Sequence, residues 1–410
     1  MTVPLPTPPT PSTRWGPVAW ADQVSIFQPR QAAFWLFSFL LAIASVSFVD
    51  EQATFADAST TAWLVGLVLL AVYAVPVYVL VNTLDLFERE PTSMLIGALL
   101  WGAIVATFLA GRINTDWDSI IQKLFGADFA RAWGAAIIGP GVEELVKFLG
   151  VVLLYLIARA EFDDVLDGFV YGALVGLGFT LAEDMYYFFT HFVGQAGLTN
   201  LGGLFEGFFI RVVVGGPYSH VLLTGLTGMG FAYYVTRPDV SRQRRTLVTI
   251  GLYAAGVLAH FVWNSPLLDG MLAGDPDAGA WITWAAIKGL PFLLFLAYVV
   301  RRAINRERRW VSEAVAPEVA SGVMTAAELE TLEHLHLRRA ARSAMKAQKG
   351  ATGERLLARL QRAQLGLVVA AGGTGPNRDA QLVASRRLIA NLREDLEAVA
   401  DAGFVGRHAT

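Results

Sequence analysis

The sequence has no cysteine among its 410 residues and carries little charge. The absence of cysteine excludes disulfides, thiolate zinc sites, a cysteine nucleophile and cysteine lipidation. Charged residues make up 16% of the chain and hydrophobic residues 54%, whereas a soluble domain has about 25% charged residues. This composition excludes an ordinary soluble globule. The net charge of −3 also lacks the basic excess that nucleic-acid binding requires, so we expect no nucleic-acid partner.

Long apolar runs dominate the middle of the chain. Eight of them lie near residues 32–49, 61–83, 93–111, 133–157, 165–189, 207–235, 247–265 and 281–300. Each is about as long as a bilayer-spanning helix, which needs ~17–25 apolar residues, and within lipid only a helix satisfies the backbone of such a segment. The predicted fold class is therefore all-α: a polytopic membrane protein of about eight transmembrane helices in contact with the lipid bilayer. These helices form a domain over 32–300, with its core at 133–265.

The two ends of the chain have different compositions. Residues 1–31 begin with a proline-rich stretch, which predicts a disordered segment and is not typical of a signal peptide. Residues 301–410 are rich in Ala, Arg, Glu and Leu at helical spacing, interrupted by Gly350 and Gly353. This pattern predicts a C-terminal cytoplasmic helical bundle, whose partner the sequence does not identify.

Basic residues in the loops predict the orientation, because Lys and Arg are enriched on the cytoplasmic side. One set of segments carries thirteen: Arg14, Arg30, Arg89, Arg159, Arg237, Arg242, Arg244, Arg245, Arg301, Arg302, Arg306, Arg308 and Arg309. The opposite set carries three: Arg112, Lys123 and Arg131. Eight crossings with both termini in the cytoplasm fit this alternation.

Four consecutive predicted spans carry polar groups that lipid disfavours. They are Glu143, Glu144 and Lys147 in span four, Glu183 and Asp184 in span five, Arg211 and His220 in span six, and His260 and Asn264 in span seven. An ionisable side chain near the bilayer centre costs several kcal/mol unless it faces a cavity or a partner. With the orientation above, all four clusters fall in the outer half of the membrane. We therefore expect a polar chamber that opens toward the extracytoplasmic side.

Simpler interpretations compete with a functional one. Glu143 and Glu144 are suited to the start of a helix that is broken before Pro140, with Lys147 as their ion-pair partner. The two histidines are also suited to hydrogen bonds between packed helices. Even so, a helix broken at membrane depth has to line protein or water, so this interpretation also requires a cavity.

Three further charged residues have less distinctive patterns. Arg211 is either a counter-charge for a carboxylate or an interface anchor. Asp184 points about 100° away from Glu183 on a helix and is predicted to be interfacial. Lys288, isolated in the last span, is predicted to snorkel toward the membrane surface.

The predicted chamber contains the groups needed for hydrolysis without a covalent intermediate. A partly buried glutamate can take a proton from water, and His or Asn donors can stabilise an oxyanion. Two histidines with one or two glutamates also form a plausible zinc site, so Glu143, Glu144, His220 and His260 are possible metal ligands. The cofactor therefore remains open between zinc and none. Ser219 and His220 are adjacent and do not face each other on a helix, which disfavours a nucleophilic serine.

The motifs GPGVEELVK, GFTLAED, SHVLLTG and HFVWN, preceded by DLFEREP at 85–91, together resemble the PrsW family of bacterial intramembrane proteases, which is related to the prenyl-protein (CAAX) endopeptidases. The resemblance covers about residues 60–300. It implies cleavage of a membrane-anchored protein, of the anti-sigma-factor type, near the extracytoplasmic face of a bacterial cell membrane.

Carried onto this sequence, the resemblance implies that Glu143 or Glu144 activates water, that Glu183 and His220 orient it or share protons, and that His260 and Asn264 bind the oxyanion. Lys147 and Arg211 are then structural charge partners. A non-catalytic transporter or receptor with an ion- or solute-binding chamber is the alternative, although paired repeats typical of transporters are absent. An inactive scaffold is a third hypothesis.

Overall fold

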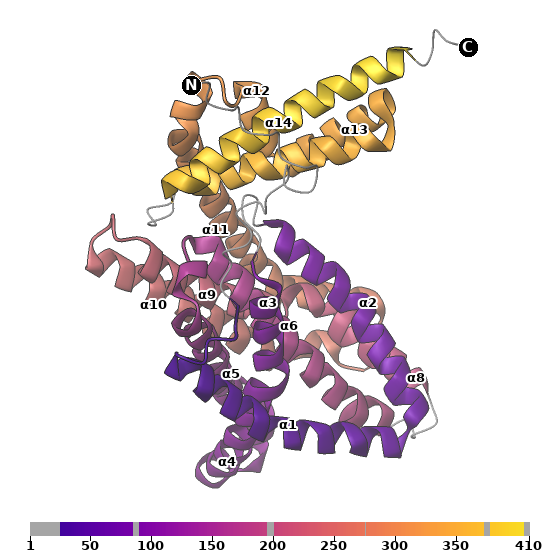
Figure 1. Cartoon of the computed structure of the whole chain (residues 1–410). Helices are drawn as coiled ribbons and strands as arrows, with labels where there is room; N and C mark the ends of the chain where they lie inside the picture. The colour runs from indigo at the N-terminus through magenta and orange to yellow at the C-terminus, as the bar shows by residue number, and fades with distance from the viewer. Residues whose placement is uncertain (1–24, 85–89, 195–200, 275, 373–377, 406–410) are drawn as a thin grey trace, which may run out of the picture. The chain divides into compact units, whose positions relative to one another are not determined.

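The computed structural model describes residues 25–84, 90–194, 201–274, 276–372 and 378–405, and within these the protein is helical without strands (Figure 1). The predicted all-α class is thereby confirmed. The chain divides near Ala303 and Ile304 into a membrane unit and a C-terminal unit. Most of the proline-rich segment 1–31 and of the motif at 85–91 lies outside the described residues.

The membrane unit contains α1 (Ala32–Ala58), α2 (Thr60–Leu84), α3 (Thr92–Leu100), α4 (Thr107–Phe125), α5 (Ala127–Ile157), α6 (Val165–Tyr187), α8 (Leu201–Gly207), α9 (His220–Thr236), α10 (Arg242–Asn264) and the first part of α11 (Ala278–Ala320). Three π-helical segments, η2 (Trp101–Ala106), η4 (Phe188–Val193) and η5 (Phe208–Val214), continue α3, α6 and α8. Short 3₁₀ turns are η3 (Arg159–Glu161), η6 (Gly216–Tyr218) and η7 (Asp269–Leu272).

Six described segments are long and apolar enough to cross a bilayer: Ala32–Ala58, Thr60–Leu84, Thr92–Phe125, Val165–Val193, Arg242–Leu272 and Ala278–Ala320. Leu201–Val214 and Gly216–Thr236, bent by 47° at their junction, form a seventh if they count as one span. The predicted count of eight is not confirmed, because α5, which carries Glu143, Glu144 and Lys147 in its apolar stretch, is not among these segments. The protein is a multi-pass membrane protein in either case.

Helix α6 forms the centre of the membrane unit and is buried along most of its length. Its N-terminus is fixed by a capping box in which Asp164 and Asp167 satisfy each other's backbone N–H groups. Gly172 and Gly176 leave no room for a Cβ atom against the backbone of Thr224 and His220 on α9. A glycine-rich face permits this close packing of helices. It also brings the start of α9, and with it His220, against α6.

Helix α5 runs without interruption through Pro140, so the break predicted before Glu143 is wrong. Membrane helices tolerate an internal proline because neighbouring groups satisfy the freed backbone. Predicted span six, by contrast, is broken: the chain turns through η6 before α9 begins at His220.

The C-terminal unit contains the end of α11 together with α12 (Ala326–Glu333), α13 (Leu335–Gly372) and α14 (Arg378–Val405). Helices α13 and α14 lie side by side and share an apolar core that includes Leu360 and Ile389 (Figure 1). Ion pairs join Glu318 to Arg386 and Glu328 to Arg393. Helix α13 is kinked at Gly350, whose φ of 69° suits glycine.

Candidate active site

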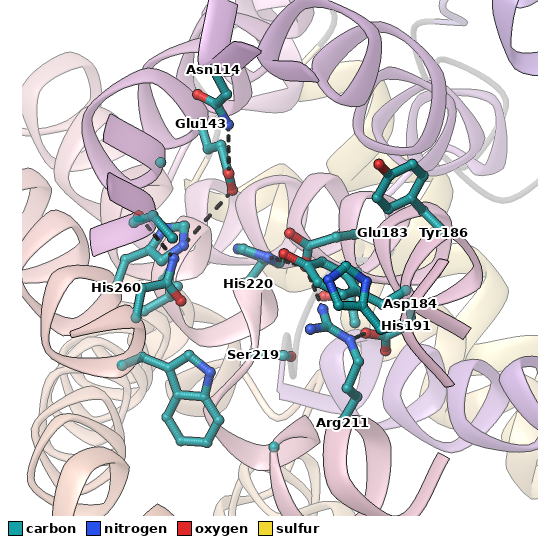
Figure 2. A pocket seen from close by; sticks show the side chains of 18 of the residues that line it. Asn114, Glu143, Glu183, Asp184, Tyr186, His191, Arg211, Ser219, His220 and His260 are labelled. Carbon is teal, nitrogen blue, oxygen red and sulfur yellow. Dashed lines mark hydrogen bonds and ion pairs between the residues drawn. The ribbon is translucent and has the colours of Figure 1, made fainter. Parts of the chain in front are cut away.

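A cavity of about 810 Å³ lies within the membrane unit, lined by α4, α5, α6, η5, α9, α10 and α11 (Figure 2). The residues predicted from the sequence that line it are Glu143, Glu183, Asp184, Arg211, His220, His260 and Asn264. The other two, Glu144 and Lys147, are fully buried and contact these lining residues. The structure thus brings together polar groups from helices that are far apart in the sequence.

Glu143 and Glu144 are neighbours in α5 but have different surroundings. Glu143 is 6% exposed and faces the cavity, where its Oε1 accepts a 3.1 Å hydrogen bond from Nδ2 of Asn114. Glu144 has no exposed surface. It accepts hydrogen bonds of 2.8 Å from Lys147 and 3.0 Å from Thr224. Of the two carboxylates, only Glu143 is positioned to meet a molecule in the cavity.

Lys147 and His220 connect the carboxylates of α5 to that of Glu183 on α6. Nζ of Lys147 lies 2.7 Å from Nδ1 of His220. Because an ammonium group can only donate, Nδ1 accepts this bond and Nε2 carries the ring proton. Nε2 lies 3.1 Å from Oε2 of Glu183, to which it donates. The lysine also lies over the Phe179 ring, 3.8 Å from its centroid. These contacts fix both the position and the tautomer of His220.

Arg211 bonds to both Glu183 and Asp184 near the end of α6 (Figure 2). Its guanidinium donates bonds of 2.7 Å to Glu183 and 2.5 Å to Asp184, and it stacks 3.9 Å from the centroid of the Tyr187 ring. Of the two predicted alternatives, the counter-charge interpretation therefore holds. Asp184, predicted to be interfacial, is only 1% exposed. Its ion pair with Arg211 compensates its burial.

His260 on α10 faces both acidic residues of α5. Its Nδ1 lies 3.2 Å from Oε1 of Glu144, and its Nε2 lies 3.8 Å from Oε2 of Glu143. A carboxylate that holds Nδ1–H orients the opposite nitrogen of the ring, which here faces the Glu143 side. Asn264, one turn further along α10, donates a 3.3 Å bond to the carbonyl of Ala135 on α5 and also lines the cavity.

Lys288, for which snorkelling toward the membrane surface is predicted, is buried in the protein and caps the end of a helix. It is 3% exposed and its ammonium donates to the carbonyls of Trp263, at 3.1 Å, and Ser265, at 2.6 Å. Carbonyls at a helix C-terminus lack partners within the helix. Lys288 therefore holds the end of α10 on both sides of Asn264.

Asn114 is a site residue that the sequence analysis missed. It belongs to α4, beyond the end of the predicted third span, yet it lines the cavity and donates to Glu143. The signal for it was helical spacing of polar residues. Asn114 and Asp118 are four apart, and Thr115 and Ser119 repeat the interval beside them. All four line the cavity.

Three of the four predicted metal ligands come close enough to bind one ion. Glu143, His220 and His260 offer ligand atoms within 4.8 Å of one another, and a His₂Glu set with an open position is a catalytic zinc arrangement. Glu144 supports His260 instead. Four carboxylates line the cavity, those of Asp118, Glu143, Glu183 and Asp184, together with the guanidinium of Arg211. A metal held by Glu143, His220 and His260 would polarise a carbonyl and make a bound water more acidic. To bind that metal, His220 would give up its contact with Glu183 or with Lys147.

A bundle of apolar helices that encloses carboxylates, imidazoles and an amide around one cavity is the architecture of an intramembrane hydrolase. The family described as PrsW family intramembrane metalloprotease matches residues 90–300, more than half of the chain, so the chain belongs to the PrsW family of intramembrane proteases.

Two relatives support this assignment. Protease PrsW of Geobacillus kaustophilus (strain HTA426) is 24% identical over 242 residues, covering 58% of this chain and 89% of that protein. Protease PrsW of Bacillus subtilis (strain 168) is 24% identical over 230 residues, covering 55% and 87%. No solved structure matches the chain. The family predicted from the motifs is confirmed.

Proposed function

We propose that this protease cleaves a membrane-anchored protein of the anti-sigma-factor type near the extracytoplasmic face of a bacterial membrane, with a water molecule activated by Glu143. The observation that carries the proposal is the contrast between the two adjacent glutamates. Glu143 faces the cavity with few hydrogen bonds, whereas Glu144 is enclosed by Lys147, Thr224 and His260.

In the proposed reaction, Glu143 takes one proton from water while the water oxygen bonds to the carbonyl carbon of the scissile peptide. Glu143 then returns this proton to the amide nitrogen as the C–N bond breaks, so the carboxylate is regenerated. A glutamate that serves first as base and then as acid contributes about 10²–10⁴-fold to the rate.

The side chains of α10 are assigned to the oxyanion. Asn264 donates from its amide, and Nε2 of His260 faces the same side of the cavity while Glu144 holds Nδ1. Loss of one such donor costs about 2.7–4 kcal/mol of transition-state stabilisation. His220 and Glu183 form a second polar wall that orients the water and the substrate. Lys147 holds His220 in place, and Arg211 holds Glu183 in place.

The orientation is part of the proposal. The excess of arginine in alternate loops favours cytoplasmic termini, and an even number of crossings follows if α5 spans the membrane as well. The cavity then opens toward the outer leaflet, which suits a substrate anchored by a single helix with an extracytoplasmic domain.

The test is cleavage by the purified chain in detergent. Single-span anti-sigma-factor substrates are incubated with wild type, H260A and N264A, and products are mapped by mass spectrometry. We expect one cut near the outer end of the substrate helix with wild type, and at least a ~100-fold loss with either variant. No cleavage of any substrate by folded wild type, or a cut on the cytoplasmic side, would contradict the proposal.

A further inference from the structure

Unpaired polar atoms gather around the cavity. Among the described residues of the membrane unit, four buried side-chain atoms lack a hydrogen-bond partner: Asn114 Oδ1, Thr180 Oγ1, Asp184 Oδ2 and Arg245 Nε. Asn114, Thr180 and Asp184 line the cavity. A buried polar atom without a partner costs about 1–3 kcal/mol, so folded proteins keep few of them. Their concentration at one cavity indicates that a ligand supplies the missing partners.

Thr180 and Asp184 form a pair on α6. They are four residues apart and therefore share a face, one turn of helix from each other. Thr180 is 3% exposed and Asp184 is 1% exposed. Asp184 uses Oδ1 for its bond from Arg211, which leaves Oδ2 as a free acceptor. The Thr180 hydroxyl can donate as well as accept.

These two free groups match the polar groups of a peptide main chain. A carboxylate oxygen needs a donor such as a backbone N–H, and a hydroxyl can bond a carbonyl oxygen. A substrate helix must unwind before its peptide bond can be attacked, and its freed N–H and C=O groups need partners at membrane depth. The site does not distinguish side chains, because it offers bonds to the main-chain N–H and C=O groups, which every residue except proline has.

Resting on the proposed function, we infer that Thr180 and Asp184 form a main-chain binding site for the unwound segment of the substrate, beside the groups that cleave it. Asp184 directly follows Glu183 in the chain, and Thr180 precedes it by about one turn of helix. Glu183 contacts His220, so a peptide held at this site is adjacent to the polar wall of the active site.

Thr180 allows a test in which stability and activity change in opposite directions. Asp184 and Asn114 each use a second atom for another bond, so their substitution disturbs Arg211 or Glu143 as well. Thr180 has one polar atom, which is unpaired, and valine has nearly the same shape. T180V should therefore raise the melting temperature, because it removes an unsatisfied hydroxyl, while it lowers kcat/KM for a single-span substrate by about three- to tenfold.

Thr227 on α9 supplies the matched control. It is also fully buried, but its hydroxyl donates a 2.9 Å bond to the carbonyl of Thr224, and it does not line the cavity. T227V should lower the melting temperature and leave kcat/KM unchanged. T180S keeps the hydroxyl and should cleave at the wild-type rate. If T180V fails to fold, T180S and T180A provide the same comparison.

The outcomes separate this inference from the proposed function. A T180V protein that cleaves as fast as wild type would overturn the main-chain site and leave the role of Glu143 intact. If T180A cleaves at the same rate as T180S, that result would likewise overturn the main-chain site. If folded wild type cleaves no membrane-anchored substrate, the proposed function itself fails. A fall in kcat/KM for T180V, with T180S at the wild-type rate, supports the site.

Discussion

Nζ of Lys147 lies 2.7 Å from Nδ1 of His220, although both side chains are buried within the membrane unit. A lysine that donates to an imidazole nitrogen selects the tautomer in which the other nitrogen carries the proton. In this protein that proton points to Glu183. The contact therefore links the side chains of α5 to Glu183 on the opposite wall of the cavity.

Replacement of Lys147 should consequently disable the site. K147M leaves Glu144 without its cation and His220 without its donor, and removal of one partner from a buried ion pair costs about 3–5 kcal/mol. We expect K147M to cleave at least ~100-fold more slowly and to unfold at lower temperature. Nitrogen NMR of labelled histidine should show that His220 loses its single tautomer. Wild-type cleavage by K147M would contradict this role.

Lys288 provides a test of whether the end of α10, which carries Asn264, must be held in place for cleavage. K288M removes both hydrogen bonds to the end of α10 and frees the backbone on either side of Asn264. Displacement of a catalytic group by about 1 Å can reduce the rate by about 100-fold, so we expect kcat to fall by about ten- to hundredfold with little change in KM. The control is K123M, since Lys123 is exposed on α4. An unchanged kcat for K288M would show that α10 needs no such cap.

Removal of metal by a chelator distinguishes a metal-dependent reaction from one in which Glu143 alone activates the water. We expect cleavage to survive chelators, because both nitrogens of His220 are already engaged by Lys147 and Glu183. The measurement is the rate before and after dialysis against a chelator, with the metal content determined in parallel. Loss of activity that zinc restores would instead assign Glu143, His220 and His260 as ligands and remove Glu143 as the base.

The ion pair between Glu328 and Arg393 should stabilise the C-terminal unit at neutral pH and lose this effect in acid. Burial alone would raise the pKa of Glu328, but the hydrogen bond from Arg393 and the backbone bond from Thr325 lower the pKa below its ordinary value of 4.5. A lowered pKa means that the ionised form stabilises the fold, so this contribution is present at neutral pH and is lost as pH falls below that value.

Hydrogen exchange of the amides in α12 tests this effect. E328Q should speed exchange at pH 7 and should differ less from wild type as the pH falls below 4.5. E330Q is the control, because Glu330 is exposed on the same helix. A difference between E328Q and wild type that is independent of pH would contradict the assignment.

The convergence of the site could be predicted because lipid makes polar residues informative. Glu143, Glu183, His220 and His260 have no favourable place in hydrocarbon, so their shared depth in the membrane indicated one chamber. This inference depends on local residue type and helical spacing, which the sequence records directly.

Other features depended on tertiary contacts. Asn114 follows a predicted span and resembles a loop residue until α4 folds over α5. Lys288 and Asp184 each had a plausible place at the membrane surface, and only their partners, the carbonyls of α10 and Arg211, account for their burial. Pro140 predicted a break, but surrounding helices keep α5 continuous. Such partners come from distant segments, which a single sequence does not pair.

The most direct test of the central claim compares the two adjacent glutamates in single-turnover cleavage of one membrane-anchored substrate. E143Q keeps the shape of the side chain but cannot take a proton. We therefore expect its cleavage rate to fall by at least ~1,000-fold with substrate binding retained. E144Q should lose activity together with thermal stability, because Glu144 is held by Lys147 and Thr224. An E143Q protein that cleaves at near the wild-type rate would contradict the account.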